Sequence, residues 1–413
     1  MTRVCVIRHG PFGSDPRVVK ESLALAEREG VVVDVLARGP EPERWIRHPN
    51  LRVTTLSVTP ASDHPIVLAL QALRFGLRAL AQVLRARPAF DVIVVHSIPS
   101  WLVLLMAPAR WRRPRFRLIL DHHEPEAEML REAGVPAAAT ALYRRVEARS
   151  VRAADGVVDV SGPMSERTAG MGARRRLVVD NAPRIFVDPD ARRPALRHDL
   201  AVFGSLIRRY DLPTLQDALL GLSRPVDLLQ VGRGPARLAE NPTAGRCRTF
   251  DHLAPPDLQI ALLTCRFGFV GLAPSSFTDL VSPNRLWELA ALGIPSIVAR
   301  TALTEELLGP FALYYRGGSA DSLRETIGTA LGMSEADRRS MGQGARNRLR
   351  SGFWESQATA FLDFCLAPPQ GRVRPNGPDD PPRSLKADRA NAENPIVTDR
   401  SRRARGAARA PGG

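Results

Sequence analysis

A helix followed directly by a buried strand, at residues 281–300, is the feature that most constrains the fold. Ser282 is a typical N-cap residue, and the proline after it suits the first helical position. Gly293 and Pro295 end the helix, because glycine favours a helix terminus and proline cannot continue one. The apolar run 296–299 is typical of a parallel strand covered on both faces. The segment therefore predicts a helix–strand unit of a parallel α/β sheet.

The start of this helix carries a polar face. Asn284 and Glu288 are four residues apart and so lie together, opposite the apolar Leu286 and Leu289. A helix N-terminus favours an anion because its free N–H groups and dipole are positive. A carboxylate accepts hydrogen bonds from sugar hydroxyls, so the pair predicts a nucleotide site, with phosphates at the helix start and ribose on Glu288. The alternative is an ordinary αβ unit with a solvated polar face, and the pattern alone does not separate the two.

Length, charge and cysteine usage limit the kind of protein. A chain of 413 residues is too long for one ordinary core, so two domains are expected. The net charge is +15, but only residues 111–116 interleave basic and aromatic side chains, so nucleic acid is not an expected partner. Four scattered cysteines without metal or redox spacing favour a reduced, cytoplasmic protein. No apolar run of about 18 residues is found, so no membrane-spanning helix is expected.

Both halves of the chain begin with a strand, a glycine loop and a helix. In the first half, a strand at 4–7 runs into a loop with Gly10 and Gly13, and a helix capped by Asp15 follows. This βαβ opening lacks G-x-G-x-x-G, so it is not a dinucleotide fingerprint. The loop either brings backbone amides to a ligand or is a plain tight turn. The second half restarts with a strand before Gly204.

Two successive strands end in histidine. The strand 91–96 ends at His96, and the next runs into Asp121-His-His-Glu124. Ligands of open α/β sheets bind at the carboxyl ends of strands, so His96 and His123 are candidate site residues. The spacing does not match a zinc site, and the D-x-D at 188–190 has no strand before it, so no metal site is predicted.

Residues 65–87 predict a long helix with Arg74, Arg78 and Arg85 along a Leu/Ala-rich body. A basic amphipathic helix can lie on an anionic membrane surface. The alternative is a core-facing helix with a solvated arginine edge.

The order of these motifs resembles that of the retaining glycosyltransferases of family 4, over about residues 1–366. The resemblance implies an α/β protein of the GT-B fold, with two Rossmann-like doubly wound domains facing a central cleft. The motifs that carry it are Ser14-Asp-Pro-Arg17, His96 before Pro99, Asp121-His-His-Glu124, Gly204-Ser205 with Arg208-Arg209-Tyr210, Gly232-Arg-Gly-Pro235, Ser282-Pro-Asn-Arg-Leu-Trp-Glu288 and Gly293-Ile-Pro295.

The resemblance also implies roles for particular residues. His123 would face the transferred sugar, Arg209 would hold the diphosphate leaving group, and Glu288 would bind the ribose. On the acceptor side it implies His96 and Glu124. The implied donor-binding residues are Gly10, Gly13, Gly204, Arg208, Gly232, Ser282, Asn284 and Asp279.

Two positions depart from the family pattern. The first glutamate of its two-glutamate motif is replaced by Leu280, with Asp279 beside it as the expected substitute. The lysine that often follows the diphosphate arginine is missing from residues 211–216, which leaves Arg208 as its expected replacement.

The expected domains are an N-terminal acceptor-side domain and a C-terminal nucleotide-sugar-binding domain. Their bounds are 1–182 and 200–350, with a linker at 183–199, a terminal helix at 351–366 that crosses back to the N-terminal domain, and a disordered basic tail at 367–413.

The expected function is a retaining, metal-independent transfer of a hexosyl or N-acetylhexosaminyl group. The donor would be a nucleotide-sugar, UDP-linked, and the acceptor a glycan, a small molecule or a lipid-linked sugar. The basic segments 74–87, 110–117 and 144–152 favour an anionic membrane surface as partner, and hence a location in the cytoplasm or at the inner face of the membrane. The alternatives are a non-catalytic GT-B subunit that partners another transferase, and a nucleotide-sugar epimerase of the same fold.

Overall fold

The computed structural model describes residues 1–13, 15–39, 46–57, 65–112, 116–191, 194–235, 238 and 245–367. The chain divides into two compact units, residues 1–367 and 368–413, and all of the described residues lie in the first. The predicted basic tail therefore falls, apart from Ala367, outside the described residues.

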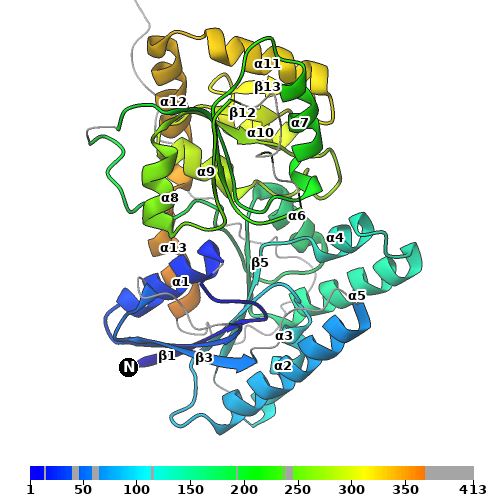
Figure 1. Ribbon diagram of the computed structural model, residues 1–413. Coiled ribbons are helices and arrows are strands. Elements are labelled where there is room, and N and C mark those ends of the chain that lie inside the picture. Colours follow the sequence, from blue (N-terminus) through cyan, green and yellow to red (C-terminus); the bar gives the residue numbers. More distant parts are fainter. Residues whose placement is uncertain are drawn as a thin grey trace, which may run out of the picture. The chain divides into compact units, whose positions relative to one another are not determined.

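The first half of the chain forms a seven-stranded, wholly parallel sheet of order β3-β2-β1-β4-β5-β6-β7 (Figure 1). Its strands are β1 (Thr2–Arg8), β2 (Val31–Arg38), β3 (Leu51–Ser57), β4 (Val92–His96), β5 (Arg117–His122), β6 (Gly156–Asp159) and β7 (Arg176–Val178). The crossing order places β1 and β4 side by side at the centre, the switch point of a doubly wound sheet.

Helices cover both faces of this sheet, which explains why the middle residues of its central strands are apolar on both faces. In β1, Val4 and Val6 pack against α1 (Pro16–Glu27) and α13 (Trp354–Leu366). The alternate Cys5 and Ile7 face the other side. That side is covered by α2 (Pro65–Arg85), α3 (Leu102–Met106), η2 (Ala107–Trp111) and α5 (Ala137–Ala153) (Figure 1). Two shorter helices, α4 (Glu126–Glu132) and α6 (Gly162–Gly170), follow β5 and β6.

The second half forms a six-stranded sheet of order β10-β9-β8-β11-β12-β13, again parallel in every described pairing. Its strands are β8 (His198–Phe203), β9 (Leu228–Val231), β10 (Cys247–Phe250), β11 (Cys265–Val270), β12 (Ser296–Ala299) and β13 (Leu313–Tyr315). One face packs on α7 (Leu212–Leu220) and α11 (Ala320–Gly332), and the other on α8 (Pro255–Leu262), α9 (Asn284–Ala291), α10 (Ala302–Leu308) and α12 (Glu335–Leu349). Two single 3₁₀ turns, η3 (Arg208–Tyr210) and η4 (Arg350–Gly352), also lie in this half of the described chain.

The predicted start of α9 is one residue too early, because the prediction put the first helical residue at Pro283 and not at Asn284. The helix begins at Asn284, and its N-cap position is Pro283, which offers no side-chain cap. Ser282 does not cap the helix because its Oγ accepts a hydrogen bond from the Trp287 indole N–H at 2.9 Å. The N–H groups of the first turn therefore have no side-chain cap, although the N–H of Leu286 donates to the Pro283 carbonyl at 3.0 Å.

The sequence predicted no membrane-spanning helix, and one described helix, α2, is nevertheless long and apolar enough to pass the test for one. By length and composition alone, Val67–Arg85 could cross a bilayer. In the structure, however, Phe75, Ala79 and Val83 of this helix are buried against the sheet.

Candidate functional site

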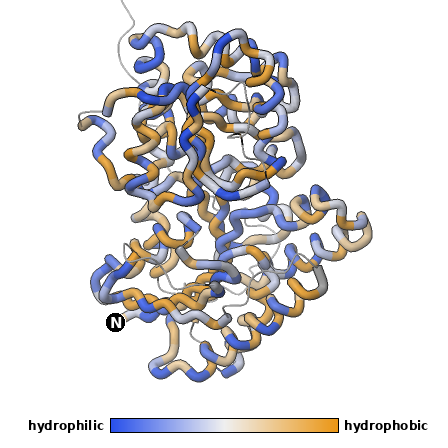
Figure 2. The backbone as a smooth tube through the Cα atoms, viewed as in Figure 1, coloured by the Kyte–Doolittle hydropathy of each residue, from blue (hydrophilic) through white to orange (hydrophobic). Residues whose placement is uncertain are grey.

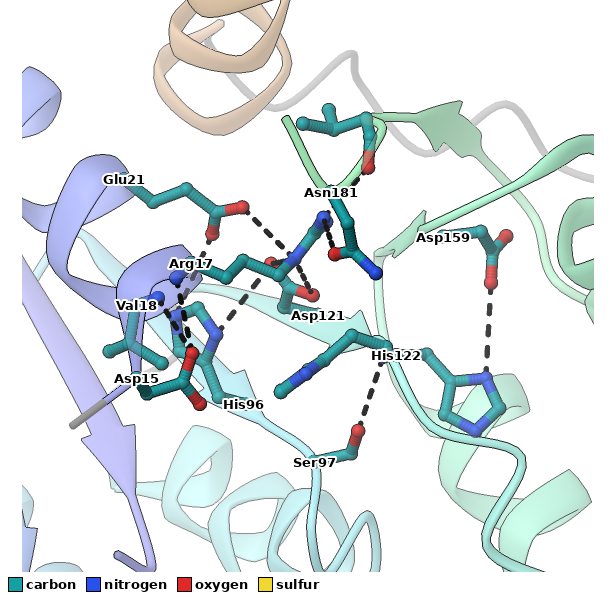
Figure 3. A network of polar contacts seen from close by, with 12 residues as sticks. Asp15, Arg17, Val18, Glu21, His96, Ser97, Asp121, His122, Asp159 and Asn181 are labelled. Atoms are coloured by element: carbon teal, nitrogen blue, oxygen red, sulfur yellow. Dashed lines mark hydrogen bonds and ion pairs between the residues drawn. The ribbon is translucent and has the colours of Figure 1, made fainter. Parts of the chain in front are cut away.

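A buried arginine at the start of α1 organises the carboxyl ends of β4 and β5. The Arg17 Nε donates to both carboxylate oxygens of Asp121, at 2.9 and 3.1 Å. Its Nη1 donates to the Val179 carbonyl at 2.7 Å and to Asn181 Oδ1 at 3.3 Å (Figure 3). Burial alone would raise the pKa of Asp121, but the Arg17 guanidinium holds it well below its usual range. The Asp121 carboxylate is therefore ionised at every ordinary pH, and the strand ends are held in one geometry.

The two strand-end histidines meet beside this ion pair. Their rings pack edge to face, with centroids 5.9 Å apart. The Nδ1 of His96 lies 3.6 Å from Asp121 and its Nε2 lies 3.8 Å from Glu21. Burial lowers the pKa of His96 to about 4 and that of His123 to about 3, so both rings are neutral at pH 7. Among the described residues, nothing bonds the buried Nε2 of His123, which leaves one ring nitrogen for a ligand.

The same residues form a group with ligand atoms suited to a metal. One nitrogen of His96, one of His123 and a carboxylate oxygen of Asp121 lie within 4.8 Å of one another. The charge of Asp121 is already neutralised by Arg17, whose Nε lies 2.9 Å from the Asp121 carboxylate. A cation bound to this carboxylate would therefore be repelled by the Arg17 guanidinium. The donor set therefore fits a sugar hydroxyl better than a divalent ion.

The glycine loop after β8 packs against an arginine that sequence reasoning missed. Arg285, in the first turn of α9, is 5% exposed; its Nη2 donates to the Ser205 carbonyl at 3.2 Å. Its guanidinium carbon lies 3.9 Å from the centroid of the Tyr210 ring. No described residue bonds its buried Nη1, and burial lowers its pKa. Gly204 has φ +87°, and a Cβ there would lie 3.1 Å from Arg285 Nη2, so any other residue would strain the backbone and press on the guanidinium.

Arg209 lies on η3 and contacts the other half of the protein. Its Nε donates to Glu132 at 2.9 Å, and its guanidinium stacks on Phe277 with 4.1 Å to the ring centroid. Glu124 interacts electrostatically with Arg209. Burial raises the pKa of Glu124 to about 7, and the positive charge of Arg209 acts to lower it. Arg208 is exposed. Arg209 can therefore exchange a carboxylate partner for a phosphate.

Glu288 lines a small cavity between α1 and the second half of the chain. The cavity has a volume of about 70 Å³, and its lining includes Asn284, Lys20 and the apolar Leu258. Glu288 is 8% exposed and accepts one long hydrogen bond, 3.4 Å from Gln259 Nε2. Burial raises its pKa to about 7. The predicted pair of Asn284 and Glu288 thus lines one cavity, with Asn284 on the exposed side.

Two of the predicted glycines lie close together, and a third is already engaged. A Cβ on Gly232 would come within 1.9 Å of the Gly204 carbonyl oxygen, so the two loops of the second sheet touch. The N–H of Gly10, which was predicted to lie beside the donor phosphates, donates to the Arg8 carbonyl at 2.9 Å. Gly13 is half-buried.

The leucine that replaces the first motif glutamate has a packing role. Leu280 packs with Val160 and Met164 of the first half, and its carbonyl accepts from Ser161 Oγ at 2.5 Å. A carboxylate at this position would have to be buried against two apolar side chains. Asp279, its expected substitute, is exposed.

The two facing α/β domains, with strand-end histidines on one side and a glycine loop beside an arginine on the other, define a protein of the GT-B class. Residues 13–182 match the family described as "Glycosyl transferase 4-like domain". The resemblance seen in the sequence is thereby confirmed.

Known proteins agree with this placement. A "UDP-glycosyltransferase TURAN" of Arabidopsis thaliana is 28% identical over 213 residues, which cover 48% of this chain and 44% of that protein. The match thus spans less than half of the relative's length.

Solved structures confirm the GT-B fold. A sucrose-phosphate synthase of Thermosynechococcus elongatus has a TM-score of 0.63 at 17% identity, over 88% of this chain and 98% of that one. Anabaena Alr3699/HepE, solved in complex with UDP-glucose, has a TM-score of 0.63 at 13% identity, over 88% and 99%. A putative UDP-N-acetylglucosamine 2-epimerase of Listeria monocytogenes has a TM-score of 0.58 at 15% identity, over 87% and 95%. At these identities the likeness shows the fold alone.

Proposed function

We propose that this chain is a retaining glycosyltransferase that takes a hexosyl or N-acetylhexosaminyl group from a UDP-sugar, without a metal ion. One observation carries the proposal. Arg285 and Glu288 stand three residues apart on α9, both buried, and neither forms an ion pair within the described residues. An unpaired buried charge is costly, so its retention points to a ligand that completes it. A diphosphate suits the arginine fork, and ribose hydroxyls suit the carboxylate.

Similarity to other proteins supports the UDP donor. The Arabidopsis relative is named a UDP-glycosyltransferase, and the Anabaena structure holds UDP-glucose. The cavity of about 70 Å³ at Glu288 is smaller than the roughly 300–1,000 Å³ of a ligand pocket. A nucleotide would therefore extend from it along the start of α9 towards the loop of Gly204.

The proposed mechanism depends on charge placement. As the glycosidic bond breaks, negative charge gathers on the diphosphate, and Arg285 and Arg209 stabilise it there in place of a metal ion. His123, neutral and with Nε2 unbonded by any described residue, offers a hydrogen bond to the sugar. The leaving phosphate would receive the acceptor's proton, so the protein mainly orients the reactants and excludes water.

Calorimetry with UDP, GDP and ADP tests the donor class. We expect UDP to bind, and Glu288→Ala to bind it more weakly because the ribose loses its acceptor. Equal affinity of the mutant would place the ribose elsewhere, and preference for GDP or ADP would correct the base.

One observation favours a second function, a non-catalytic GT-B subunit. Leu280 occupies the position of the first motif glutamate, and its side chain makes an apolar contact between the two halves of the chain. A subunit of this kind would bind a partner transferase and show no turnover of any UDP-sugar, whereas an epimerase would release an epimerised sugar or nucleotide-sugar.

We further propose that the acceptor is a glycan or lipid-linked sugar handled in the cytoplasm or at its membrane face, with nucleic acid playing no part. The exposed arginines on the acceptor-side half support this proposal.

A further inference from the structure

The outer face of α2 carries leucines that the fold does not cover. Leu70, Leu73 and Leu77 are 60%, 42% and 51% exposed, and they follow one another at spacings of three and four residues. The opposite face of the helix carries Phe75 and Ala79, which are buried against the sheet. Figure 2 shows hydrophobic and hydrophilic segments mixed along this helix at the lower edge of the view. The sheet therefore covers only part of the apolar surface of α2.

Arginines border this leucine stripe, and no carboxylate of the described residues lines the groove beside it. Arg74 and Arg78 line the same shallow groove as Leu70, Leu73 and Leu77. The sequence of α2, from Pro65 to Arg85, contains no Asp or Glu. Such a helix, apolar on one stripe and purely basic beside it, is typical of a helix that lies in the headgroup region of a bilayer.

The neighbouring helices extend the surface in the same layer. Helix α3 packs against both α2 and α5, and η2 packs against α2. Trp111, at the end of η2, is 88% exposed, and Leu142 on α5 is 57% exposed. The outward arginines of α5 are Arg144, Arg145, Arg149 and Arg152. Tryptophan prefers the boundary between hydrocarbon and water, and arginine can snorkel from it to phosphates.

We infer that the layer of α2, η2 and α5 is a docking surface for a phospholipid bilayer with anionic headgroups. Charge complementarity selects this occupant, because the exposed ionisable groups of α2 are all cationic. Helix α2 lies on the surface and does not cross it, since Phe75, Ala79 and Val83 are engaged by the protein core. The inference does not depend on glycosyl transfer, but it would place the acceptor-side domain at a membrane.

Vesicle sedimentation of the full chain tests this surface. Vesicles of phosphatidylcholine with phosphatidylglycerol should carry the protein down at low salt, and vesicles of phosphatidylcholine alone should not. Arg74→Gln should weaken the partition about fivefold. The double variant Leu73→Gln/Leu77→Gln should weaken it about tenfold or more, since two half-exposed leucines lose their apolar burial.

The matched control is Leu220→Gln, an equally exposed leucine (47%) on α7 of the second sheet, which should partition as the unchanged protein does. All variants should bind UDP with unchanged affinity, so that loss of docking is separable from failure of the donor site. Absence of binding to anionic vesicles, or an equal loss in Leu220→Gln, would overturn the inference. So would a homodimer that Leu73→Gln/Leu77→Gln dissociates, because the leucines would then contact a second copy.

Discussion

Replacement of Arg285 by methionine separates nucleotide binding from stability. Methionine fills a similar volume without charge, so the change removes the guanidinium from the loop of Gly204 and little else. In the free protein, Arg285 gains about 2 kcal/mol or less from the Tyr210 ring and about 1.5–3 kcal/mol from its bond to Ser205. Burial of a charge with an unbonded nitrogen costs several kcal/mol. The two sides nearly cancel, so the free energy of unfolding should change by about 1 kcal/mol or less.

Binding should respond much more strongly. In the complex, the fork would make charge-assisted bonds to the diphosphate, and their loss costs about 3 kcal/mol, or about 150-fold in Kd for UDP. Uridine lacks the diphosphate, so its affinity should be the same for Arg285→Met and the unchanged protein. Calorimetry with both ligands measures the two effects, and urea unfolding measures stability.

Two further variants make the result interpretable. Arg285→Lys keeps the charge without the fork and should lose about tenfold in UDP affinity. Arg266, at the amino end of β11, also has a buried Nε that no described residue bonds, so Arg266→Met is a matched control that should bind UDP normally. Undiminished UDP affinity in a folded Arg285→Met protein would refute the assignment of the diphosphate to this arginine.

Three other changes follow from the same structure. Burial raises the pKa of Glu288 to about 7, so the UDP affinity of the unchanged protein, relative to Glu288→Gln, should rise as the carboxyl ionises between about pH 6 and 8. Because the pKa of Glu288 is raised in the folded protein, its contribution to stability is complete below the unfolded pKa and is lost as the pH rises through about 7. The two expectations would be contradicted if the difference between the unchanged protein and Glu288→Gln, in UDP affinity by calorimetry and in stability by unfolding, did not depend on pH. Glu132→Gln frees Arg209 from a part-exposed ion pair, so UDP should bind up to about fivefold more tightly, and weaker binding would show that Glu132 assists the ligand. Asp121→Asn removes one of the two buried carboxylates beside the Arg17 guanidinium and leaves Glu21, 3.2 Å away, as the other; it should cost about 3 kcal/mol in urea unfolding, whereas a loss below about 1 kcal/mol would mean that the Asp121 ion pair does not hold the strand ends.

Much of the fold could be predicted because buried parallel strands form continuous apolar runs in the sequence. The strand before His96 and the one before Asp121 were both expected, and the register pairs these two residues directly. Strand β3 was not expected. It lies at the edge of its sheet, and its residues are half-buried or exposed, so its alternation is weak. Local pattern alone did not show which sheet the terminal helix at 351–366 would cover, whereas the resemblance predicted that it crosses back to the N-terminal domain, and α13 shares a core with β1.

The site was harder to predict because its contacts join distant parts of the chain. Arg285 bonds a carbonyl 80 residues earlier, and its position in a first helical turn beside Asn284 and Glu288 was the one signal available. The resemblance placed Gly10 beside the donor phosphates, but it could not show that the Gly10 amide already bonds the Arg8 carbonyl within its own loop. Spacing shows which residues share a helix face, whereas the bonds already made inside the protein decide which groups remain for a ligand.

The most direct test of the central claim is proton NMR of a UDP-sugar incubated with the protein, with water as the slow acceptor. An α-linked donor should release the sugar first as the α-anomer, at a rate that chelators do not change and that falls in His123→Ala and Arg285→Met. Release of the β-anomer first would contradict retention, and dependence on an added metal ion would contradict the role given to the arginines. No hydrolysis or transfer with any UDP-sugar, by a protein that binds UDP, would favour the non-catalytic subunit.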